Sequence, residues 1–406
     1  MAETNQPIRF SLGDEKLLPQ ETLLDTDVKR KQLSIGIPRE SDSFENRVAL
    51  TPEAVEILVS HGHTVLVSRS AGLEASYTDH DYSECGAQIV DSNKETFQSD
   101  LILKVAPLNI NEVGQIRGNQ TIVSSLHLTS QTESTIRKLM QKKVTAIAFE
   151  SIKDKYDCFP VVRSMSEIAG LASILIASEY LSNIHQGKGV LLGGITGITP
   201  AEVIILGAGT AAEYAARAAL GLGATVIIFD QSVYKMRRLQ NNLGNRVQTS
   251  VFHPRVLKKT LSSADVVIGA IHLTGESPRY FVTEEMVKGM KKGAVIVDIS
   301  IDQGGCIETS RYMNHGDPVF TKHGVIHYCV NNIPSRVART ASIALSNVFT
   351  PIISEIADAG GLKNRLKIDS GLRRGVYLLN GILTSNIIGH RFGILSKDID
   401  LLLAAF

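Results

Sequence analysis

The chain has 406 residues, of which 43% are hydrophobic and 20% are charged, and its formal net charge is +1. This composition is that of an ordinary globular protein, and the length suggests two domains of usual size. A net charge near zero argues against a nucleic acid or an anionic membrane surface as the partner, because neither would be attracted by long-range electrostatics.

The first 32 residues are polar, mixed in charge and without a sustained period, which predicts an N-terminal extension over 1–32. They lack the basic and apolar segments of a signal peptide. No stretch of the chain approaches the roughly 20 apolar residues of a membrane helix. The four cysteines form no CxxC pair and lie near no histidine at zinc-site spacing, so neither disulfides nor a metal are expected. The expected location is the cytoplasm.

Strand and helix patterns alternate from Ser34 onward. SIGIPRE is typical of a strand, and a helix is expected to begin at Thr51-Pro52, with Thr51 as the N-cap and Pro52 at the first helical position. TVLVS, LILKVAP, TIVSSLHL and VTAIAFE follow as apolar strands with helical patterns between them. This alternation predicts a parallel α/β domain that ends near Glu150.

A long helix is expected over 165–181, and a second α/β unit begins at Glu202 with AEVIILGAG, a helical pattern and TVIIFD. ADVVIGA, GAVIVDIS and VIHYCV are further core-strand patterns. The segment from Thr340 to Phe406 is mostly helical and is expected to pack back onto the first domain. The predicted fold class is therefore α/β, with two Rossmann-like parallel-sheet domains formed by residues 33–161 with 339–406 and by residues 162–338.

The strongest motif is VIILGAGTAAEYAARAALGLGATVIIFD, where Gly207, Gly209 and Ala212 take the three small positions of a dinucleotide-binding turn. Gly207 permits the tight turn, Gly209 lets a pyrophosphate approach the backbone, and Ala212 lets the helix pack closely on the strand. Phosphates would then lie at the positive end of the helix. Because strand, helix, second strand and a terminal acid follow in order, the motif is more specific than GxGxxA alone.

Asp230 ends the second strand of this unit, where a ribose-binding acid belongs. Its carboxylate would accept hydrogen bonds from ribose hydroxyls and repel a 2′-phosphate, which predicts NAD rather than NADP as the cofactor. Lys235 and Arg237 lie nearby, so some tolerance of NADP stays open. The alternative is a Rossmann domain that has lost its ligand, with Asp230 acting only as a turn residue.

Three polar residues follow predicted strands, at the edge where open α/β sheets bind ligands. Arg47 lies in a loop and could bind a carboxylate through two hydrogen bonds, or be a solvated arginine. His127 ends an apolar strand and could exchange a proton with a carbonyl or amine, or be structural. Asp302 follows VDIS and could activate water, or merely cap a turn. None of them carries a function alone.

Together these segments resemble the alanine dehydrogenase and pyridine nucleotide transhydrogenase family from about Ser34 to Ile394. The resemblance rests on IGIPRES, ENRVALTP, GHTVLVSRSAG, LILKV, SSLHL, MSEIAG, LLGGITGI, ILGAGTA, DISIDQGGC and YCVNNIPS, in the family's order. It implies an NAD-dependent enzyme that oxidatively deaminates L-alanine, or a similar small amino acid, to a 2-oxo acid and ammonia. It also implies a homo-oligomer, commonly a hexamer.

Matched residue by residue, the resemblance makes His127 and Asp302 catalytic and gives Arg47 the substrate carboxylate. Water oriented by Asp302 would add to a 2-imino acid, and His127 would shuttle protons as ammonia leaves. Besides the glycine turn, the residues implied to contact the cofactor are Ser166, Asp230, Lys235, Ile271, His272, Ile299, Asp302, Arg311, Val330, Asn332 and Ile333.

One position departs clearly from the family. The family motif K-V-K-E-P is here Lys104-Val105-Ala106-Pro107, so Ala106 replaces the lysine that binds the substrate's carbonyl or amine. Residues two apart in a strand share a face, so Lys104 would point the same way about 6.6 Å further back. Lys104 is therefore the candidate substitute in substrate binding. His272 is a smaller departure, because the family usually has an aliphatic residue there.

The missing lysine keeps other functions open. The chain could be a non-catalytic NAD-binding protein, in which the cofactor binds but no amino acid is oxidised. Transhydrogenase-type and lysine- or saccharopine-type dehydrogenases share the fold. Against the transhydrogenase, the segment VVRSMSEIAG lacks that protein's longer loop, and the chain ends without an expected membrane span.

Overall fold

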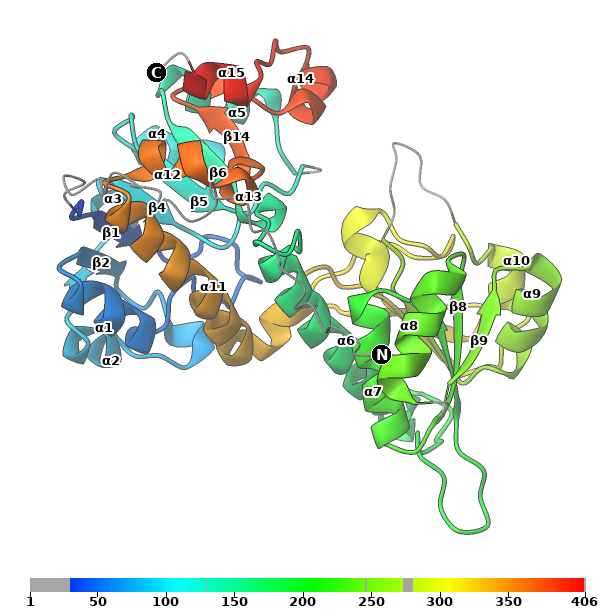
Figure 1. Ribbon diagram of the computed structural model, residues 1–406. Coiled ribbons are helices and arrows are strands. Elements are labelled where there is room, and N and C mark those ends of the chain that lie inside the picture. Colours follow the sequence, from blue (N-terminus) through cyan, green and yellow to red (C-terminus); the bar gives the residue numbers. More distant parts are fainter. Residues whose placement is uncertain (1–29, 129, 245–246, 273–279, 405–406) are drawn as a thin grey trace, which may run out of the picture.

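The computed structural model describes residues 30–128, 130–244, 247–272 and 280–404. Two lobes, each a β-sheet flanked by helices, are joined by helices α6 (Pro160–Leu181) and α11 (Ala338–Asp358) (Figure 1). The expected extension, 1–32, lies almost wholly outside the described residues. At its end, Arg30 forms an ion pair with Asp358 at the end of α11 (Nε–Oδ1 2.8 Å).

The first lobe contains an eight-stranded sheet in the order β15-β14-β6-β5-β4-β1-β2-β3. Its N-terminal strands run parallel to one another, as predicted. They are β1 Ser34–Ile37, β2 Thr64–Ser68, β3 Gln88–Val90, β4 Leu101–Leu103, β5 Thr121–Ser124 and β6 Thr145–Ala148. The helices between them are α1 Pro52–Ser60, α2 Asp79–Glu84, α3 Asn93–Thr96, α4 Ile110–Gln115 and α5 Glu133–Gln141, with the 3-10 turn η2 Leu73–Ala75. A second 3-10 turn, η3 Phe149–Ser151, follows β6.

The C-terminal segment returns to this lobe, but it adds strands as well as the expected helices. β14 (Val376–Leu379) pairs antiparallel with β6, and β15 (Ile382–Leu383) pairs antiparallel with β14, so the sheet is mixed. The turn between them is Asn380-Gly381, and both residues have positive φ (49° and 79°), as a tight hairpin requires. The helices of this segment are α12 Leu362–Ile368, α13 Ser370–Arg373, α14 Asn386–Phe392 and α15 Ile399–Ala404.

The second lobe contains a seven-stranded sheet in the order β12-β13-β11-β10-β7-β8-β9. It is parallel except for the edge strand β12, which is antiparallel to β13. The strands are β7 Glu202–Leu206, β8 Thr225–Asp230, β9 Gln248–Val251, β10 Val266–Gly269, β11 Val295–Asp298, β12 Val319–Lys322 and β13 Val325–Tyr328. The helices and turns are η4 Asn183–His185, α7 Thr210–Gly221, α8 Val233–Leu243, α9 Pro254–Ser263, α10 Glu284–Lys288, η5 Ile299–Gln303 and η6 Ile333–Val337.

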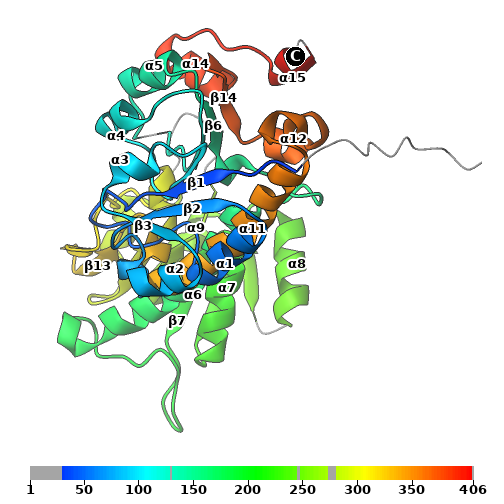
Figure 2. The same ribbon diagram turned by 90° about the vertical axis from the view of Figure 1, so that its left-hand side faces the viewer.

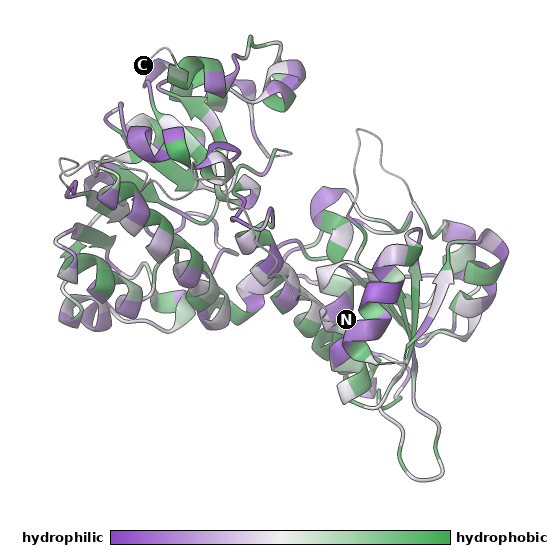
Figure 3. Cartoon of the chain, in the orientation of Figure 1, coloured by the Kyte–Doolittle hydropathy of each residue, from purple (hydrophilic) through white to green (hydrophobic). Residues whose placement is uncertain are grey.

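Both sheets confirm the predicted α/β class with two Rossmann-like lobes. Every residue of β6, β10, β11, β13 and β14 is buried, as expected for strands that helices cover on both faces. The central strands are apolar, whereas a helix such as α8 is largely hydrophilic (Figure 3). In the second sheet the chain runs outward from β7 to β9 and then returns to β10. The boundary between β7 and β10 is therefore the point where such sheets bind ligands.

Helices α6 and α11 contact each other between the lobes (Figure 1), and the turned view shows α11 running beside α1 of the first lobe (Figure 2). The helix expected from Met165 begins earlier, at Pro160, a residue well suited to the first helical position. The predicted domain boundaries, 161/162 and 338/339, fall within α6 and at the start of α11. Because both lobes share these helices, the division at those residues stays a prediction.

The sequence analysis did not anticipate how apolar these two helices are. By length and composition alone, Pro160–Leu181 and Ile333–Asp358 could each cross a membrane. However, 44% and 50% of their apolar windows are buried inside the fold, as in the core helices of a globular protein.

The loop before α1 is attached to α11. Thr51 is the N-cap of α1 and Pro52 its first residue, as predicted, but the Thr51 side chain makes no capping hydrogen bond. Instead its backbone N–H donates to Ser346 Oγ, and the N–H of Val48 donates to Ser342 Oγ, both at 2.9 Å. Small hydroxyl side chains on α11 therefore position this loop beside the junction of the lobes.

Helices α6 and α7 cross at close range where α6 carries Gly170. A Cβ at Gly170 would lie 2.3 Å from Ala211 O and 3.0 Å from Ala215 N. Glycine thus lets the backbones of the two helices touch, and α7 is the helix that follows the predicted dinucleotide turn.

We expect Gly170→Ala to destabilise the protein, because the added methyl group must push α6 and α7 apart. Overpacking of this kind costs roughly 1–3 kcal/mol, which should lower the thermal unfolding midpoint by on the order of 5 °C. Gly221→Ala is the matched control, since a Cβ at the end of α7 meets nothing within 4 Å. Calorimetry measures both variants, and equal midpoints would contradict the close crossing.

Candidate functional site

The turn between β7 and α7 has the geometry that its motif predicts. Gly207 has φ +109°, and a Cβ there would lie 2.4 Å from Ala270 O, so this position requires glycine. Gly209 is the N-cap of α7, and a Cβ there would meet nothing within 4 Å. Since the N-cap residue is glycine and no capping side chain is found among the described residues, the first backbone N–H groups of this 12-residue helix are available to an external acceptor such as a phosphate.

Asp230 lies beside this turn at the end of β8. Its Oδ2 accepts from Ala208 N–H and its Oδ1 from Ser232 N–H, both at 2.7 Å. The carboxylate is therefore attached to the turn while its side chain stays only half-buried. Ala212 is fully buried, as a close-packing residue should be, and Lys235 is exposed on α8. An open glycine turn, an uncapped helix and an adjacent acid fit a dinucleotide.

Other residues expected to contact the cofactor lie past the carboxyl ends of β10, β11 and β13, at the same edge as the turn. Ile271 N–H donates to Ser300 Oγ (2.9 Å), and a 2.9 Å hydrogen bond joins His272 Nδ1 to Gln303 Nε2. Ile299 begins η5 directly after β11. Their side-chain roles stay predictions, but their placement is the predicted one.

Four further residues expected to contact the cofactor differ in how buried they are and in what their side chains touch. Val330 and Ile333 are buried where the chain leaves β13, and Ser166 is half-buried on α6. Arg311 instead stacks on Phe320 of the edge strand β12, with its guanidinium 4.2 Å from the ring centroid. The structure thus gives the Arg311 side chain a partner within the protein, and its contact with the cofactor stays a prediction.

Asp298, which the sequence analysis did not single out, organises this edge. It is fully buried, and its carboxylate accepts from Ser300 N–H (3.1 Å), Cys306 N–H (3.1 Å) and Ser310 Oγ (2.7 Å). Burial raises the pKa of Asp298 to about 6, although these hydrogen bonds oppose the rise. An acid at the end of the apolar run VIVD was the available signal.

Arg47 is buried and paired rather than solvated. Its Nε and Nη2 donate to Oε1 and Oε2 of Glu45 at 2.7 and 2.6 Å, and its Nη1 donates to Met165 Sδ on α6 at 3.3 Å. A guanidinium has five N–H groups. Within the described residues these partners leave one N–H on each terminal nitrogen, which is the pair that a ligand carboxylate accepts.

Glu45 is a second residue that the sequence analysis missed, although it lies only two positions before Arg47. Burial by itself would raise the pKa of Glu45, but the charge and hydrogen bonds of Arg47 outweigh burial, and the pKa is lowered. Asn332 Nδ2 in the other lobe also donates to Glu45 Oε2 (2.8 Å) and lowers it further. The pair is therefore ionised at neutral pH.

His127 lies exposed in the loop after β5, with φ +41°, a backbone conformation unusual for a residue with a side chain. Glu150 Oε1 stabilises this backbone conformation by accepting hydrogen bonds from the N–H groups of Leu126 (2.7 Å) and His127 (3.3 Å). Ser130 donates to His127 O through both its N–H and its Oγ, at 2.9 Å each. Strained backbone conformations that several hydrogen bonds hold in place are common at functional sites.

Asp302 lies in η5 of the second lobe and interacts electrostatically with His127 and Arg47 of the first. Its Oδ1 accepts from Asn332 N–H (3.2 Å). Loss of solvent around the carboxyl group raises the pKa of Asp302. The charges of His127 and Arg47 and the hydrogen bond from Asn332 N–H partly oppose this rise. Asp302 of the second lobe therefore lies near enough to His127 and Arg47 of the first for its charge to interact with both.

Lys104 is not brought to this junction. Its side chain is 1% exposed, forms an ion pair with Glu40, and places Nζ 3.7 Å from Glu112 Oε1 and 3.4 Å from Ala106 O. Burial raises the pKa of Glu40 to about 7, although Lys104 opposes the rise. A lysine enclosed between two carboxylates is not free to bind a substrate, and this geometry speaks against Lys104 as the substitute at Ala106.

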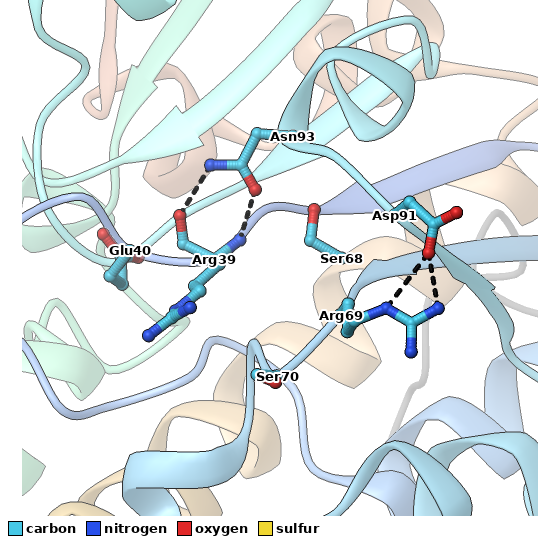
Figure 4. A pocket seen from close by; sticks show the side chains of 7 residues that line it. All are labelled: Arg39, Glu40, Ser68, Arg69, Ser70, Asp91 and Asn93. Carbon is cyan, nitrogen blue, oxygen red and sulfur yellow. Dashed lines mark hydrogen bonds and ion pairs between the residues drawn. The ribbon is translucent and has the colours of Figure 1, made fainter.

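A separate hollow of about 390 Å³ lies past the carboxyl ends of β1, β2 and β3 (Figure 4). Its walls are Arg39, Glu40, Ser68, Arg69, Ser70, Asp91 and Asn93. The Asn93 amide bonds the backbone of Arg39 in both directions at 2.8 Å, and Arg69 pairs with Asp91. None of the residues predicted to act on substrate or cofactor lines it, so it is distinct from the junction site.

Comparison with known proteins places the chain among dehydrogenases. Residues 36–169 match the family described as alanine dehydrogenase/PNT, N-terminal domain, and residues 173–386 match the corresponding C-terminal domain. An alanine dehydrogenase of Staphylococcus saprophyticus is 40% identical over 367 residues, which cover 90% of this chain and 98% of the relative. Another, of Methanococcus maripaludis, is 40% identical over 352 residues, which cover 86% and 94%.

Two solved structures resemble most of this chain. An L-alanine dehydrogenase matches with a TM-score of 0.84 and 35% identity, covering 89% of this chain and 99% of that one. A transhydrogenase from Sinorhizobium meliloti matches with a TM-score of 0.74 and 23% identity, covering 87% and 99%. At that lower identity the second match shows a shared fold alone.

The Glu45–Arg47 pair predicts how stability depends on pH. Because the folded pKa of Glu45 lies below its ordinary value of 4.5, the pair stabilises the fold above that pH, and this stabilisation is lost as pH falls through the lowered value. Glu45→Gln leaves Arg47 buried without the carboxylate that is hydrogen-bonded to it, which costs roughly 3–5 kcal/mol at neutral pH.

Urea unfolding from neutral to acidic pH measures this effect. The stability difference between wild type and Glu45→Gln should shrink toward low pH, because protonated Glu45 comes to resemble glutamine. Glu56→Gln, on the exposed face of α1, is the control and should stay close to wild type throughout. A difference that does not change with pH would show that the pair is not ionised in the fold.

Proposed function

The chain belongs to the alanine dehydrogenase/PNT family, and we propose that it is an enzyme that deaminates L-alanine oxidatively and reversibly to pyruvate and ammonia, with NAD as cofactor. One observation carries the proposal: in this chain, Asp302 of one lobe interacts with Arg47 and His127 of the other. The chain is also about 40% identical to two alanine dehydrogenases.

The cofactor site is assigned to the second lobe. NAD⁺, when bound, supplies the acceptor for a hydride from Cα of the amino acid. Gly207 and Gly209 leave the backbone open to a pyrophosphate, and the uncapped start of α7 faces an anion favourably. Asp230 offers its carboxylate to ribose hydroxyls and would repel a 2′-phosphate, which favours NAD over NADP.

The residues of the junction have separate roles. Arg47 binds the substrate carboxylate through the two N–H groups that Glu45 and Met165 leave free. His127 transfers protons to and from the substrate's nitrogen or oxygen. Asp302 orients the water that attacks the imine carbon, and because its pKa is raised, its carboxylate is a stronger base than a fully solvated one.

Ala106 favours one alternative, a non-catalytic NAD-binding protein, because the enclosed Lys104 does not replace the missing lysine. The identity to alanine dehydrogenases over almost the whole chain outweighs this single position. No comparable observation favours a transhydrogenase or a lysine- or saccharopine-type dehydrogenase.

We further propose that the protein is a homo-oligomer. The segment 186–201 projects from the second lobe (Figure 1), and its Leu191, Ile195 and Ile198 side chains are 67%, 59% and 63% exposed. Leu175 on α6 is 62% exposed as well. Apolar side chains gathered on a projecting segment are typical of surfaces that another chain covers.

Purified protein with NAD⁺ and a panel of small L-amino acids at alkaline pH tests the activity, with NADP⁺ in parallel. We expect NADH to form with L-alanine, and His127→Gln to lower kcat by at least about 100-fold because the proton shuttle is lost. His61→Gln, at an exposed histidine after α1, is the matched control and should keep wild-type rates. NADH binding without oxidation of any amino acid would instead support the non-catalytic alternative.

The assembly is tested by sedimentation velocity. Replacing Ile195 and Ile198 by serine should lower the mass of the assembly, because their apolar surface would no longer drive association. Val251→Ser, at a valine of β9 that is 48% exposed, controls for the loss of any exposed apolar side chain. An unchanged mass in the double variant would remove segment 186–201 from the interface.

A further inference from the structure

Asn332 lies where the lobes meet, at the N-cap of η6, and three of its polar groups are bonded. Its backbone N–H donates to Asp302 Oδ1 (3.2 Å), and its side-chain Nδ2 donates to Glu45 Oε2 (2.8 Å) in the other lobe. Its carbonyl oxygen accepts from His315 Nε2 (3.2 Å). One residue thus contacts two carboxylates that belong to different lobes.

The backbone of Asn332 is left-handed, with φ +60° and ψ 45°. Asparagine tolerates this region far better than most residues that carry a side chain. In this conformation the backbone N–H and the side-chain amide reach two different acceptors. The sequence position therefore requires both a left-handed backbone and an uncharged donor.

The carboxylate that Asn332 reaches is the one that orients Arg47. Glu45 Oε2 accepts from Asn332 Nδ2 and from Arg47 Nη2 (2.6 Å). A displaced Glu45 would turn the guanidinium and the two N–H groups that remain for a ligand. An amide stabilises Glu45 without adding charge, whereas a carboxylate at this position would repel both Glu45 and Asp302.

We propose that Asn332 is a positioning residue that sets Arg47 relative to Asp302 across the junction, acting through Glu45. The proposal rests on the proposed function. It differs from the role of cofactor contact that the family resemblance implies, because it places the effect of Asn332 on the substrate's carboxylate and not on the dinucleotide.

Asn332→Gly isolates this interaction. Glycine keeps the left-handed backbone and the N–H that Asp302 accepts, so the bond from the side-chain amide to Glu45 is what the variant removes. KM for pyruvate and L-alanine, kcat, and the Kd of NADH by fluorescence are measured for the variant and the wild type.

Ser335→Ala is the matched control. Ser335 joins the same two segments, since its Oγ accepts from Asn46 N–H (2.8 Å) and donates to Phe44 O (2.7 Å). It has no hydrogen bond to Glu45 or Asp302 among the described residues. General loosening of the junction would affect this variant as well.

We expect Asn332→Gly to raise KM for pyruvate by about 10-fold or more, because a guanidinium that Glu45 no longer orients would lose one charge-assisted hydrogen bond to the substrate carboxylate. Its Kd for NADH and the constants of Ser335→Ala should stay close to wild type. An unchanged KM, or a raised Kd for NADH with an unchanged KM, would overturn the proposal. So would a Ser335→Ala variant with the same rise in KM.

A wild-type protein that oxidises no amino acid would contradict the proposed function. In that case the interaction between Asn332 and Glu45 is tested by a measurement that needs no substrate. The thermal unfolding midpoints of Asn332→Gly, Glu45→Gln and the double variant form a cycle. Non-additive changes would show that the two side chains interact in solution, and additive changes would overturn the proposal.

Discussion

The ion pair of Glu45 with Arg47 is the interaction on which the junction of the lobes depends. An arginine buried without a carboxylate would cost several kcal/mol, so the loop before α1 could not present this guanidinium unless Glu45 accompanied it. Glu45 accepts from one side of the guanidinium and leaves the terminal N–H pair free. The same carboxylate accepts from Asn332 of the second lobe. Charge balance, the proposed binding of a ligand carboxylate and a hydrogen bond between the lobes therefore all involve this one side chain.

Much of the fold was predictable because its signals are local. Apolar runs bounded by turn residues predicted both sheets, and the glycine turn was recognisable because its spacing is contiguous in sequence. The added strands β14 and β15 were missed since the long helical period of α11 dominates that segment, although Asn380-Gly381 is a hairpin signal. Which strand an apolar run pairs with depends on partners far away in sequence, and β6 is more than 200 residues from β14.

The candidate site was predictable in part, and Lys104 shows where such reasoning ends. The expectation that Lys104 faces the substrate rested on strand alternation, but β4 ends at Leu103, so the alternation no longer applies at residues 104–106. Two carboxylates from other segments, Glu40 and Glu112, decide where the ammonium lies. The role of Glu150 was likewise out of reach, because it stabilises a loop through hydrogen bonds that no spacing in the sequence encodes. Asp298 differs, since an acid at the end of the apolar run VIVD was a signal, although its partner Cys306 was not predictable.

The late strand β14 also has a consequence for how the chain is made. The strands of the second lobe are contiguous, from 202 to 328, and can pair while the tail is still in the ribosome. The first sheet cannot be completed then, because β6 keeps an edge of unpaired N–H and C=O groups until residues 376–379 emerge. At roughly 5–20 residues per second, translation of the intervening chain takes on the order of 10–50 s. During that interval the exposed edge of β6 makes the nascent chain most prone to edge-to-edge association with another chain. A chaperone would reduce this association most effectively by covering that edge.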